Sequence, residues 1–472
     1  MDNNPQTLII GAGPAGIAAA YHLSHHDAPA TVYEMDDTLG GIARTVEYRN
    51  FRFDVGGHRF FTKIDRIREL WKKIMGDDFI SRERKSRIFY RGTLIDYPLK
   101  ISSALKALGI WESLACLGSY FWAQAFPVEE DSFEGWVTNR FGRRLYEHFF
   151  KTYTEKAWGM PCTELSADWA AQRIKSLSLW GAIIGALQSS TGTKHTTLIQ
   201  QFDYPRRGPG MMWEKFREDI EDHGGRFALQ HRVTRLHHDG ERVTGVSMQT
   251  PDGMQETAPE YVLNSMPLKE LVQAFDPPPP DEVLQAAQKL RYRSFITAGL
   301  IIDAAEPFDD QWIYVHEPDV RVARIQNYKS WSPEMVPDPD MTCVGVEYFL
   351  WRDEPLWEAP DEEIIDLAGR ELSQLELVEA DAVVDGDVVR MPHAYPVYDP
   401  GYTDRVATIR QWLEKFQNFG SIGRNGQHRY NNMDHSMLTG LLAAENILGA
   451  NHDVWDVNIG EEYLEARREN GT

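Results

Sequence analysis

The segment TLIIGAGPAGIAAAYHL, residues 7–23, decides the fold of this 472-residue chain. Residues 7–10 are suited to a buried strand, the turn that follows contains Gly11, Gly13 and Gly16, and a helical pattern begins at once. A second strand pattern, ATVYE, ends at Glu34. This order of strand, glycine-rich turn, helix and strand predicts a βαβ unit of the kind that binds dinucleotides.

The glycine turn also predicts how a dinucleotide would be held. The first glycine permits the tight turn, the second lets the backbone approach a diphosphate, and the third allows close packing of helix and strand. The diphosphate is therefore expected at the helix N-terminus beside Ala15. Glu34 is expected to accept hydrogen bonds from a ribose.

A second glycine pair, in LGGIAR at residues 39–44, favours FAD over NAD. Gly40 and Gly41 allow the backbone to pass close to a ligand again, and Arg44 follows them. No second GxGxxG turn lies at a strand–helix junction, so no NAD(P)H domain is expected, and NAD(P)H stays open as an external reductant. Together these motifs resemble the glutathione-reductase-like flavoproteins, especially their amine oxidase and protoporphyrinogen oxidase branch, and no motif for covalent flavin attachment is visible.

The patterns along the rest of the chain predict an α/β fold with α+β insertions. Residues 100–200 are mostly helical in pattern, alternating strands begin near residue 226 with a hairpin turn at Asp252-Gly253, and strand patterns recur from 295 to 350. We therefore expect a glutathione-reductase-like Rossmann FAD domain built from residues 1–80, 205–275 and 415–472. A helical insertion domain at 100–200 and an antiparallel β-sheet substrate domain at 280–410 are expected to interrupt it.

The charge of the chain excludes some partners. A formal net charge of −22, from 71 acidic and 49 basic residues, argues against nucleic acid. The three cysteines show neither metal-ligand spacing nor a disulfide pattern, so we expect no metal site and a reducing, cytoplasmic compartment. No signal peptide is visible, and the apolar stretch 104–126 contains Lys106 and Glu112. This stretch predicts a buried or interfacial helix rather than a membrane span, and it leaves peripheral membrane contact and homo-oligomerisation open.

Five segments resemble those of the UDP-galactopyranose mutases, flavoenzymes that interconvert the pyranose and furanose forms of a nucleotide sugar. In chain order they are FDVGGHRFFT at 53–62, FFKTYTEKAWG at 149–159 followed by Arg173, RIQNYKSWSP at 324–333, AYPVY at 394–398, and GRNGQHRYNNMDHS at 423–436. Their shared order is the specific part of the match.

The resemblance implies two groups of site residues. The expected flavin-binding residues are those of the two glycine loops together with Gly57, His58, Val233, Arg424, Asn432, Met433 and Asp434. The expected substrate-binding residues are Phe149, Tyr153, Trp158, Arg173, Arg324, Tyr395 and Tyr430. Those expected to be catalytic are His58, Arg173, Arg324, Tyr395 and Tyr430.

The reaction that the resemblance implies is the isomerisation of UDP-galactopyranose, or of a related sugar nucleotide, in cell-surface polysaccharide biosynthesis. It requires reduced FAD, whose N5 acts as the nucleophile at the anomeric carbon. The residue types suit this ligand, since paired arginines offer charge-assisted, bidentate contacts to a diphosphate. Tyr395 and Tyr430 can donate hydrogen bonds to phosphate oxygens, and Tyr153 can stack on a base.

The same residues also have structural interpretations. His58 could be a core histidine bonded to backbone, Arg173 and Arg324 could form surface ion pairs, and Trp158 could be plain core. The basic groups at residues 82–87 and 206–207 could be solvated faces or could steer an anionic substrate.

Two other functions stay open. One is an FAD-dependent oxidoreductase of the amine oxidase, protoporphyrinogen oxidase or desaturase type, with the apolar stretches 104–126 and 177–188 lining an entry channel. The other is a flavin-carrying assembly or regulatory protein without turnover. The segment between Arg173 and Asp203 is longer and more helical than in bacterial mutases, which leaves the sugar and the base open.

Overall fold

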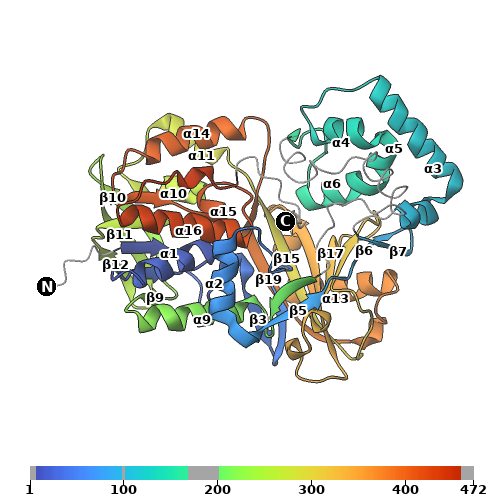
Figure 1. Ribbon diagram of the computed structural model, residues 1–472, viewed down its shortest axis with the longest axis horizontal. Helices are drawn as coiled ribbons and strands as arrows, with labels where there is room; N and C mark the ends of the chain where they lie inside the picture. Colours follow the sequence, from blue (N-terminus) through green and yellow to red (C-terminus); the bar gives the residue numbers. More distant parts are fainter. Residues whose placement is uncertain (1–6, 98–100, 168–200, 459–472) are drawn as a thin grey trace, which may run out of the picture.

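The computed structural model describes residues 7–97, 101–167 and 201–458. Three sheets of five, four and seven strands organise this part of the chain, and a group of helices projects beyond them (Figure 1). Arg173 and the apolar stretch 177–188 lie outside the described residues.

The five-stranded sheet is parallel and carries the glycine-rich start of the chain. Its order is β20-β13-β1-β2-β9, with β1 (Thr7–Ile10), β2 (Thr31–Tyr33), β9 (Arg226–Ala228), β13 (Tyr261–Asn264) and β20 (Phe419–Ser421). β1 is buried at every position, as expected of a central strand of a parallel sheet. The first strand, the turn and helix α1 (Pro14–Ser24) form the predicted βαβ opening.

The first and the last long helices lie side by side over this sheet (Figure 1). Helix α16 (Met433–Ile447) crosses α1 so closely that a Cβ at Gly440 would come 2.0 Å from the carbonyl oxygen of Ala15. Helix α9 (Pro209–Asp222) also packs on α1, and its Phe216 meets the ring of Tyr21 edge-on. This domain therefore depends on segments from both ends of the chain and from its middle.

The four-stranded sheet has the order β12-β11-β10-β14. Its strands are β10 (Arg232–His238), β11 (Val243–Thr250), β12 (Gly253–Thr257) and β14 (Phe275–Asp276). β11 and β12 pair in antiparallel register from Val246↔Thr257 to Thr250↔Gly253, so the hairpin predicted at Asp252-Gly253 is present.

The seven-stranded sheet is the largest sheet in the described residues, and its order is β19-β15-β18-β17-β16-β6-β7. Its strands are β6 (Ser86–Tyr90), β7 (Thr93–Asp96), β15 (Tyr292–Ile302), β16 (Trp312–Val315), β17 (Arg324–Asn327), β18 (Thr342–Leu350) and β19 (Val383–Pro396). Neighbouring strands are antiparallel except for β16 and β6. Strands β6 and β7 precede the helical segment in the sequence. The sequence pattern did not reveal that they join this sheet.

The projecting helices are α3 (Ile101–Ala125), α4 (Phe133–Phe141), α5 (Arg143–Tyr146) and α6 (Thr152–Trp158) (Figure 1). The chain turns within α3 at Gly109, whose φ of 76° favours glycine. In the described ranges, no helix has the length and apolar character needed to cross a membrane. Cys116 and Cys162 of this region and Cys343 of β18 are free and buried.

The remaining elements cover the sheets or connect them. The two-stranded sheets pair β3 (Thr45–Tyr48) with β4 (Phe51–Asp54) and β5 (Phe79–Glu83) with β8 (Gln201–Pro205). The other helices are α2 (Asp65–Met75), α10 (Leu268–Ala274), α11 (Asp281–Gln288), α12 (Tyr328–Trp331), α13 (Asp361–Gln374), α14 (Tyr402–Leu413) and α15 (Gly423–Gly426).

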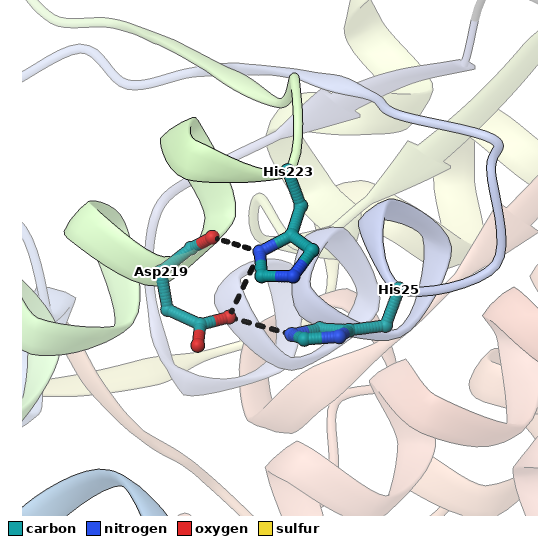
Figure 2. Close-up of side chains that lie close together, drawn as sticks. All are labelled: His25, Asp219 and His223. Atoms are coloured by element: carbon teal, nitrogen blue, oxygen red, sulfur yellow. Dashed lines mark hydrogen bonds and ion pairs between the residues drawn. The ribbon is translucent and has the colours of Figure 1, made fainter.

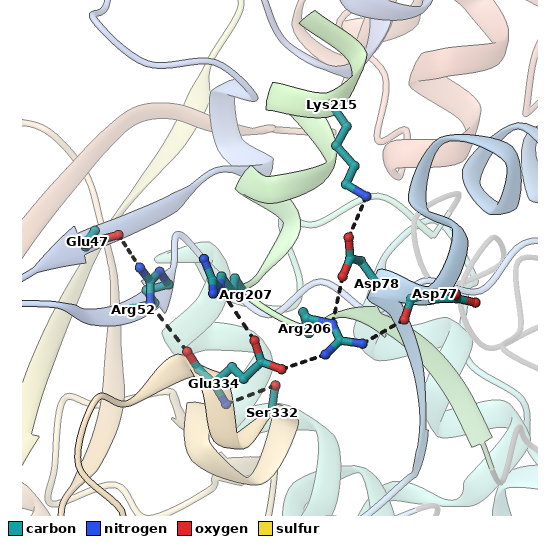
Figure 3. Close-up of polar contacts among 9 residues, drawn as sticks. All are labelled: Glu47, Arg52, Asp77, Asp78, Arg206, Arg207, Lys215, Ser332 and Glu334. Atoms are coloured by element: carbon teal, nitrogen blue, oxygen red, sulfur yellow. Dashed lines mark hydrogen bonds and ion pairs between the residues drawn. The ribbon is translucent and has the colours of Figure 1, made fainter. Parts of the chain in front are cut away.

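An ion-pair network accounts for the basic pair at residues 206–207 (Figure 3). The Arg206 guanidinium contacts Asp78 Oδ1 at 2.9 Å and Glu334 Oε1 at 2.9 Å, and Arg207 faces the other oxygen of Glu334 at 3.5 Å. Lys215 Nζ contacts Asp78 Oδ2 at 2.6 Å. These partners favour the structural interpretation of the pair, because they tie the segment between β8 and α9 to the turn before β5 and to the loop after α12.

The basic group at residues 82–87 is largely engaged in the same way. The Arg87 Nε donates to Asp310 at 2.7 Å, Lys85 pairs with Asp309, and the Arg82 Nε donates to the Trp331 carbonyl at 2.9 Å. These contacts join β5 and β6 to the loop before β16 and to α12, and most of the basic side chains in this group therefore have partners.

Candidate active site

The first glycine loop leaves open space where a ligand would lie. Gly11 has a φ of 95°, and a Cβ at Gly16 would come 2.0 Å from the Gly11 carbonyl oxygen. At Gly13, in contrast, an added Cβ would meet no atom within 4 Å. Gly11 and Gly16 are therefore required by the turn itself, whereas Gly13 keeps its backbone accessible from a cavity that it lines.

Glu34 closes the far side of this loop. Its carboxylate accepts hydrogen bonds from the backbone N–H of Ala12 at 2.7 Å and of Asp36 at 3.0 Å. Burial raises the pKa of Glu34, opposed by these two hydrogen bonds. Asp36 pairs in turn with Arg44 at 2.6 Å. The ends of the two glycine loops are thus fixed to each other before any ligand binds.

The second glycine loop faces the first. Gly40 has a φ of 97°, and a Cβ there would lie 2.4 Å from the ring of Trp213. The Trp213 Nε1 donates to the Ala43 carbonyl at 2.6 Å, so α9 supports this loop from behind. A Cβ at Gly41 would stand 3.5 Å from the Cα of Gly13, which shows how close the two loops come.

The loop with His58 follows a buried carboxyl group. Asp54 accepts hydrogen bonds from Tyr204 at 2.6 Å and Thr45 at 2.8 Å, and burial raises its pKa to about 7. A Cβ at Gly57 would lie 2.1 Å from the ring of Trp312, so only glycine lets this loop pass the β16 strand. The Asp54 contacts and this close passage fix where His58 stands.

His58 is held by backbone. Its Nε2 donates to the carbonyls of Ile42 at 3.0 Å and Val55 at 3.1 Å, so the lone pair of the neutral ring lies on Nδ1. Burial lowers the pKa of His58 to about 4. The ring is therefore neutral near pH 7, and it joins the second glycine loop to the loop at residues 55–58.

Arg324 stands at the far end of the site. It is directly opposite Glu347 in the β17–β18 register, and its Nε lies 2.5 Å from Glu347 Oε2. Glu347 is fully buried and also accepts from the Gln326 side chain at 2.6 Å. Burial alone would lower the pKa of Arg324, but Glu347, Tyr395 and Tyr153 raise it above its ordinary value. The guanidinium therefore stays charged.

Two stacked tyrosines continue from this arginine. The Arg324 Nη2 donates to the Tyr395 hydroxyl at 3.0 Å. The rings of Tyr395 and Tyr430 lie 5.5 Å apart and nearly parallel, and the Arg424 guanidinium lies 4.8 Å from the Tyr430 ring centre. Arg424 is fixed by the Asn431 and Ala394 carbonyls at 2.7 and 3.1 Å. Two arginines and two hydroxyls thus converge on one stretch of the cavity wall.

The projecting helices contribute aromatic rings. The Tyr153 ring of α6 stacks on His316 at 5.2 Å, and both line the cavity. Phe149 lines it as well. Trp158 is buried behind Tyr395, with the ring centres 6.2 Å apart, and does not line the cavity. Trp158 therefore packs behind Tyr395, which is close to its structural interpretation as a plain core residue.

One continuous cavity of about 1710 Å³ connects all these groups. It runs from the glycine loops past His58 to Arg324 and the tyrosines, and on to apolar side chains of the projecting helices. The N-terminus of α16 also faces it through Asn432, Met433 and Asp434. A cavity of this volume has room for an extended cofactor and for a second ligand.

A family model described as flavin-containing amine oxidoreductase matches residues 14–448. The chain belongs to this family. Its fold is the mixed α/β FAD-binding fold of the flavin amine oxidoreductases, with one parallel and further antiparallel sheets, as the sequence predicted.

Individual relatives of the flavin amine oxidoreductase family differ in activity. The chain is 26% identical over 176 residues to a probable UDP-galactopyranose mutase from Klebsiella pneumoniae, covering 35% of this chain and 44% of the relative. It is 30% identical over 112 residues to a 1-hydroxycarotenoid 3,4-desaturase from Flavobacterium, covering 23% of each. The chain thus spans less than half the length of either relative.

Solved structures match over nearly the whole chain. A reduced UDP-galactopyranose mutase superposes with a TM-score of 0.81 at 21% identity, covering 94% of both chains. A putative protoporphyrinogen oxidase from Exiguobacterium superposes with a TM-score of 0.70 at 18% identity, covering 95% of this chain and 99% of that one. At these identities the likeness shows the shared fold.

FAD, the cofactor that the family implies, fits the cavity on structural grounds. The backbone at Gly13 is open to the cavity, the N-termini of α1 and α16 face it, and Gly41 adds a second accessible loop. When bound there, FAD supplies the redox or nucleophilic chemistry of the site.

Most residues predicted from the sequence line this one cavity. They are Gly11, Gly13, Ala15, Glu34, Gly41, Arg44, Gly57, His58, Phe149, Tyr153, Val233, Arg324, Tyr395, Arg424, Tyr430, Asn432, Met433 and Asp434. Gly16 and Gly40 lie behind the wall, where each lets a neighbouring group approach. Arg173 lies outside the described residues.

Sequence reasoning missed Glu347, Trp312 and His316. Glu347 was detectable in principle, because it is the one charged residue in the apolar strand TCVGVEYFL of β18, and a charge there needs a buried partner. Trp312 and His316 carry no comparable signal, since their role depends on the pairing of β16 with β6 and β17.

Replacing His58 with glutamine is expected to change how stability depends on pH. Because the pKa of His58 falls from 6.5 to about 4 on folding, the unfolded chain binds the extra proton between these values. His58 therefore contributes about 1–3 kcal/mol of stability that is gained as pH rises through this window, whereas Asp54, with its raised pKa, acts in the opposite direction in both proteins. In urea unfolding, the change in the free energy of unfolding from pH 4.5 to pH 7 should be less favourable in the variant by this amount. The same change in both proteins would contradict the assignment of a neutral His58.

Proposed function

We propose that the protein is a reduced-FAD-dependent mutase that interconverts the pyranose and furanose forms of a nucleotide sugar, UDP-galactopyranose or a related compound. The observation that carries this proposal is the buried Arg324 guanidinium. It is held by Glu347 and directed to Tyr395, in the same cavity as the two glycine loops. Such a group suits a diphosphate, and it has no use in a wholly apolar tunnel.

The proposed roles follow from position. Gly11, Gly13, Gly41, Glu34 and the N-terminus of α16 hold FAD, and His58 sets the position of the loop beside it. Reduced FAD supplies the nucleophile for the anomeric carbon of the sugar.

The remaining groups act on the substrate. Arg324, Tyr395 and Tyr430 bind the diphosphate and stabilise its charge as it leaves and returns, and Arg424 supports the two rings. The base is assigned to Tyr153 and Phe149, where an aromatic ring is available for stacking. Arg173 is proposed as a second arginine for the diphosphate.

The overall negative charge of the chain makes local cations necessary for binding a diphosphate. At a net charge of −22 the protein repels anions at long range, so a diphosphate must be captured by fixed local cations. We further propose a cytoplasmic reaction in which NAD(P)H serves as the external reductant. The free, buried state of the cysteines is in keeping with a reducing compartment.

A second candidate is an FAD-dependent oxidoreductase of the desaturase or protoporphyrinogen oxidase type. It is favoured by the apolar end of the cavity, which Leu117, Phe133, Phe141 and Leu145 line. These side chains suit a hydrocarbon better than a sugar.

Product analysis with the holoenzyme separates the two functions. The protein is incubated with UDP-galactopyranose and a panel of other sugar nucleotides, with its flavin either oxidised or reduced by dithionite. We expect a new isomeric product only in the reduced samples. The absence of any product from correctly loaded protein would remove the mutase proposal, and anaerobic bleaching of oxidised flavin by an apolar substrate would establish the oxidoreductase.

A further inference from the structure

A separate group of side chains that could bind a metal ion lies at the C-terminal ends of α1 and α9. His25, Asp219 and His223 converge there from two helices, and none of them lines the cavity (Figure 2). Each offers one ligand atom, and these atoms lie within 4.8 Å of one another. The sequence prediction of no metal site rested on the cysteine spacing, and it did not include this group because His25 is almost two hundred positions from the other two.

The fold brings the three together for simple reasons. Asp219 and His223 are four residues apart on α9, so they share one face of that helix. His25 is the C-cap of α1, and His223 is the C-cap of α9. Because α1 and α9 pack side by side and end at the same level, their last turns meet (Figure 2).

The electrostatics of this place favour a cation. Each helix presents the negative end of its dipole at the C-terminus. Two such ends meet beside the Asp219 carboxylate. The neighbouring Lys73 donates to the Tyr21 hydroxyl at 2.6 Å, and the Asp219 charge also acts on it and helps to raise its pKa.

The distances are close to those of tetrahedral coordination. His25 Nε2 lies 2.6 Å from Asp219 Oδ1, and His223 Nδ1 lies 3.7 Å from the same oxygen. Two ligands on a tetrahedral zinc ion with bonds of about 2.0–2.1 Å stand about 3.3 Å apart, so small shifts of these side chains would form the site. Without a metal, His25 and Asp219 share a hydrogen bond and His223 Nδ1 donates to the Asp219 backbone carbonyl at 2.7 Å (Figure 2). A metal would replace both hydrogen bonds. His223 is exposed, so water can take the fourth position.

A second cluster, Glu112, Cys116 and His148, is less suited to a metal. Glu112 is already paired with Arg144, and His148 bonds to both Glu112 and Tyr90. Burial raises the pKa of the Cys116 thiol, which opposes the thiolate that a metal needs. The comparison favours the cluster on α1 and α9.

We propose that His25, Asp219 and His223 bind a divalent transition metal of the zinc class, which clamps the C-terminal ends of α1 and α9. Two imidazoles and one carboxylate are a ligand set that such metals accept. The clamp acts on the cofactor domain, because α1 starts at the first glycine loop and Trp213 of α9 supports the second.

Zinc titration of the FAD-loaded protein tests the proposal. The protein is first treated with EDTA and dialysed, and zinc chloride is then added in a calorimeter. We expect one site per chain that is weakened about tenfold or more in His223→Ala and in Asp219→Asn. Zinc should also raise the melting temperature, followed by the release of flavin fluorescence. Flavin absorbance confirms that each variant is folded.

His26→Ala is the matched control, since His26 is the exposed next residue and is not one of the three ligands. It should bind zinc as the parent protein does. Equal zinc binding by the parent and both ligand variants, or no binding by any of them, would overturn the site. Site-specific binding without a change in melting temperature would overturn the clamp.

Discussion

Replacing Arg324 with alanine is expected to lower kcat/KM for the sugar nucleotide about 10²–10³-fold and to destabilise the protein by about 3–5 kcal/mol. The loss of activity follows from removing a fixed cation where the diphosphate is proposed to bind. The loss of stability follows because the fully buried Glu347 carboxyl would lose its ion-pair partner. Steady-state kinetics with the reduced enzyme and urea unfolding measure the two effects.

A double variant separates these effects. In Arg324→Met combined with Glu347→Gln, the buried charge pair is gone from both strands, so most of the stability should return. Activity should not return, because the cation is still missing. Recovery of activity together with stability would show that Arg324 serves only the fold.

Tyr395→Phe is a companion variant that should lower kcat/KM and stability less than Arg324→Ala does. It keeps the ring that stacks on Tyr430 and removes only the hydroxyl that accepts from Arg324.

The substitutions Gly13→Ala and Gly16→Ala are expected to have different effects. The first should lower FAD affinity alone, and the second should lower both stability and FAD binding. At Gly13 the backbone has a φ of −79°, which alanine adopts freely, and an added Cβ meets no protein atom within 4 Å. Stability of the apoprotein should therefore change by less than about 0.5 kcal/mol. FAD affinity should fall roughly 100-fold, because the new methyl group occupies the side of the loop that the diphosphate needs.

At Gly16 the added Cβ would come 2.0 Å from the Gly11 carbonyl oxygen, so the turn itself must shift. We expect a loss of about 1–3 kcal/mol in the apoprotein as well as a loss of FAD. Fluorescence titration with FAD and urea unfolding of both apoproteins distinguish the cases. Unchanged FAD binding by Gly13→Ala would mean that the diphosphate lies elsewhere.

The parallel-sheet domain was predictable because its signals are local. The glycine spacing, the apolar strand before it and the helix after it lie within residues 7–23, and each is fixed by backbone geometry rather than by distant partners. The alternating strands from 226 to 257 were predictable for the same reason. Strands β6 and β7 were not, because their place in the seven-stranded sheet depends on a parallel pairing with β16 far along the chain.

The candidate site shows the same division. His58, Arg324, Tyr395 and Tyr430 could be named from their segments, and they do line one cavity. Sequence did not reveal that Arg324 is opposed by Glu347, or that Trp158 stands behind Tyr395. Such contacts arise from the register of β17 with β18 and from the packing of α6, which no short motif encodes. The roles of these residues in binding and catalysis stay predictions.

The order of the parallel sheet has a consequence for how the holoenzyme is made. Strand β1 is synthesised first, yet its sheet is completed by β20, and α16 closes over α1 only after that. At about 5–20 residues per second, roughly 20–80 s separate the appearance of β1 from that of β20 on the ribosome. The cofactor pocket is therefore incomplete until β20 and α16 have been synthesised, and FAD binding in it must follow their synthesis. During that interval the sheet that contains β1 lacks β20, and α1 lacks α16, which packs beside it in the folded chain.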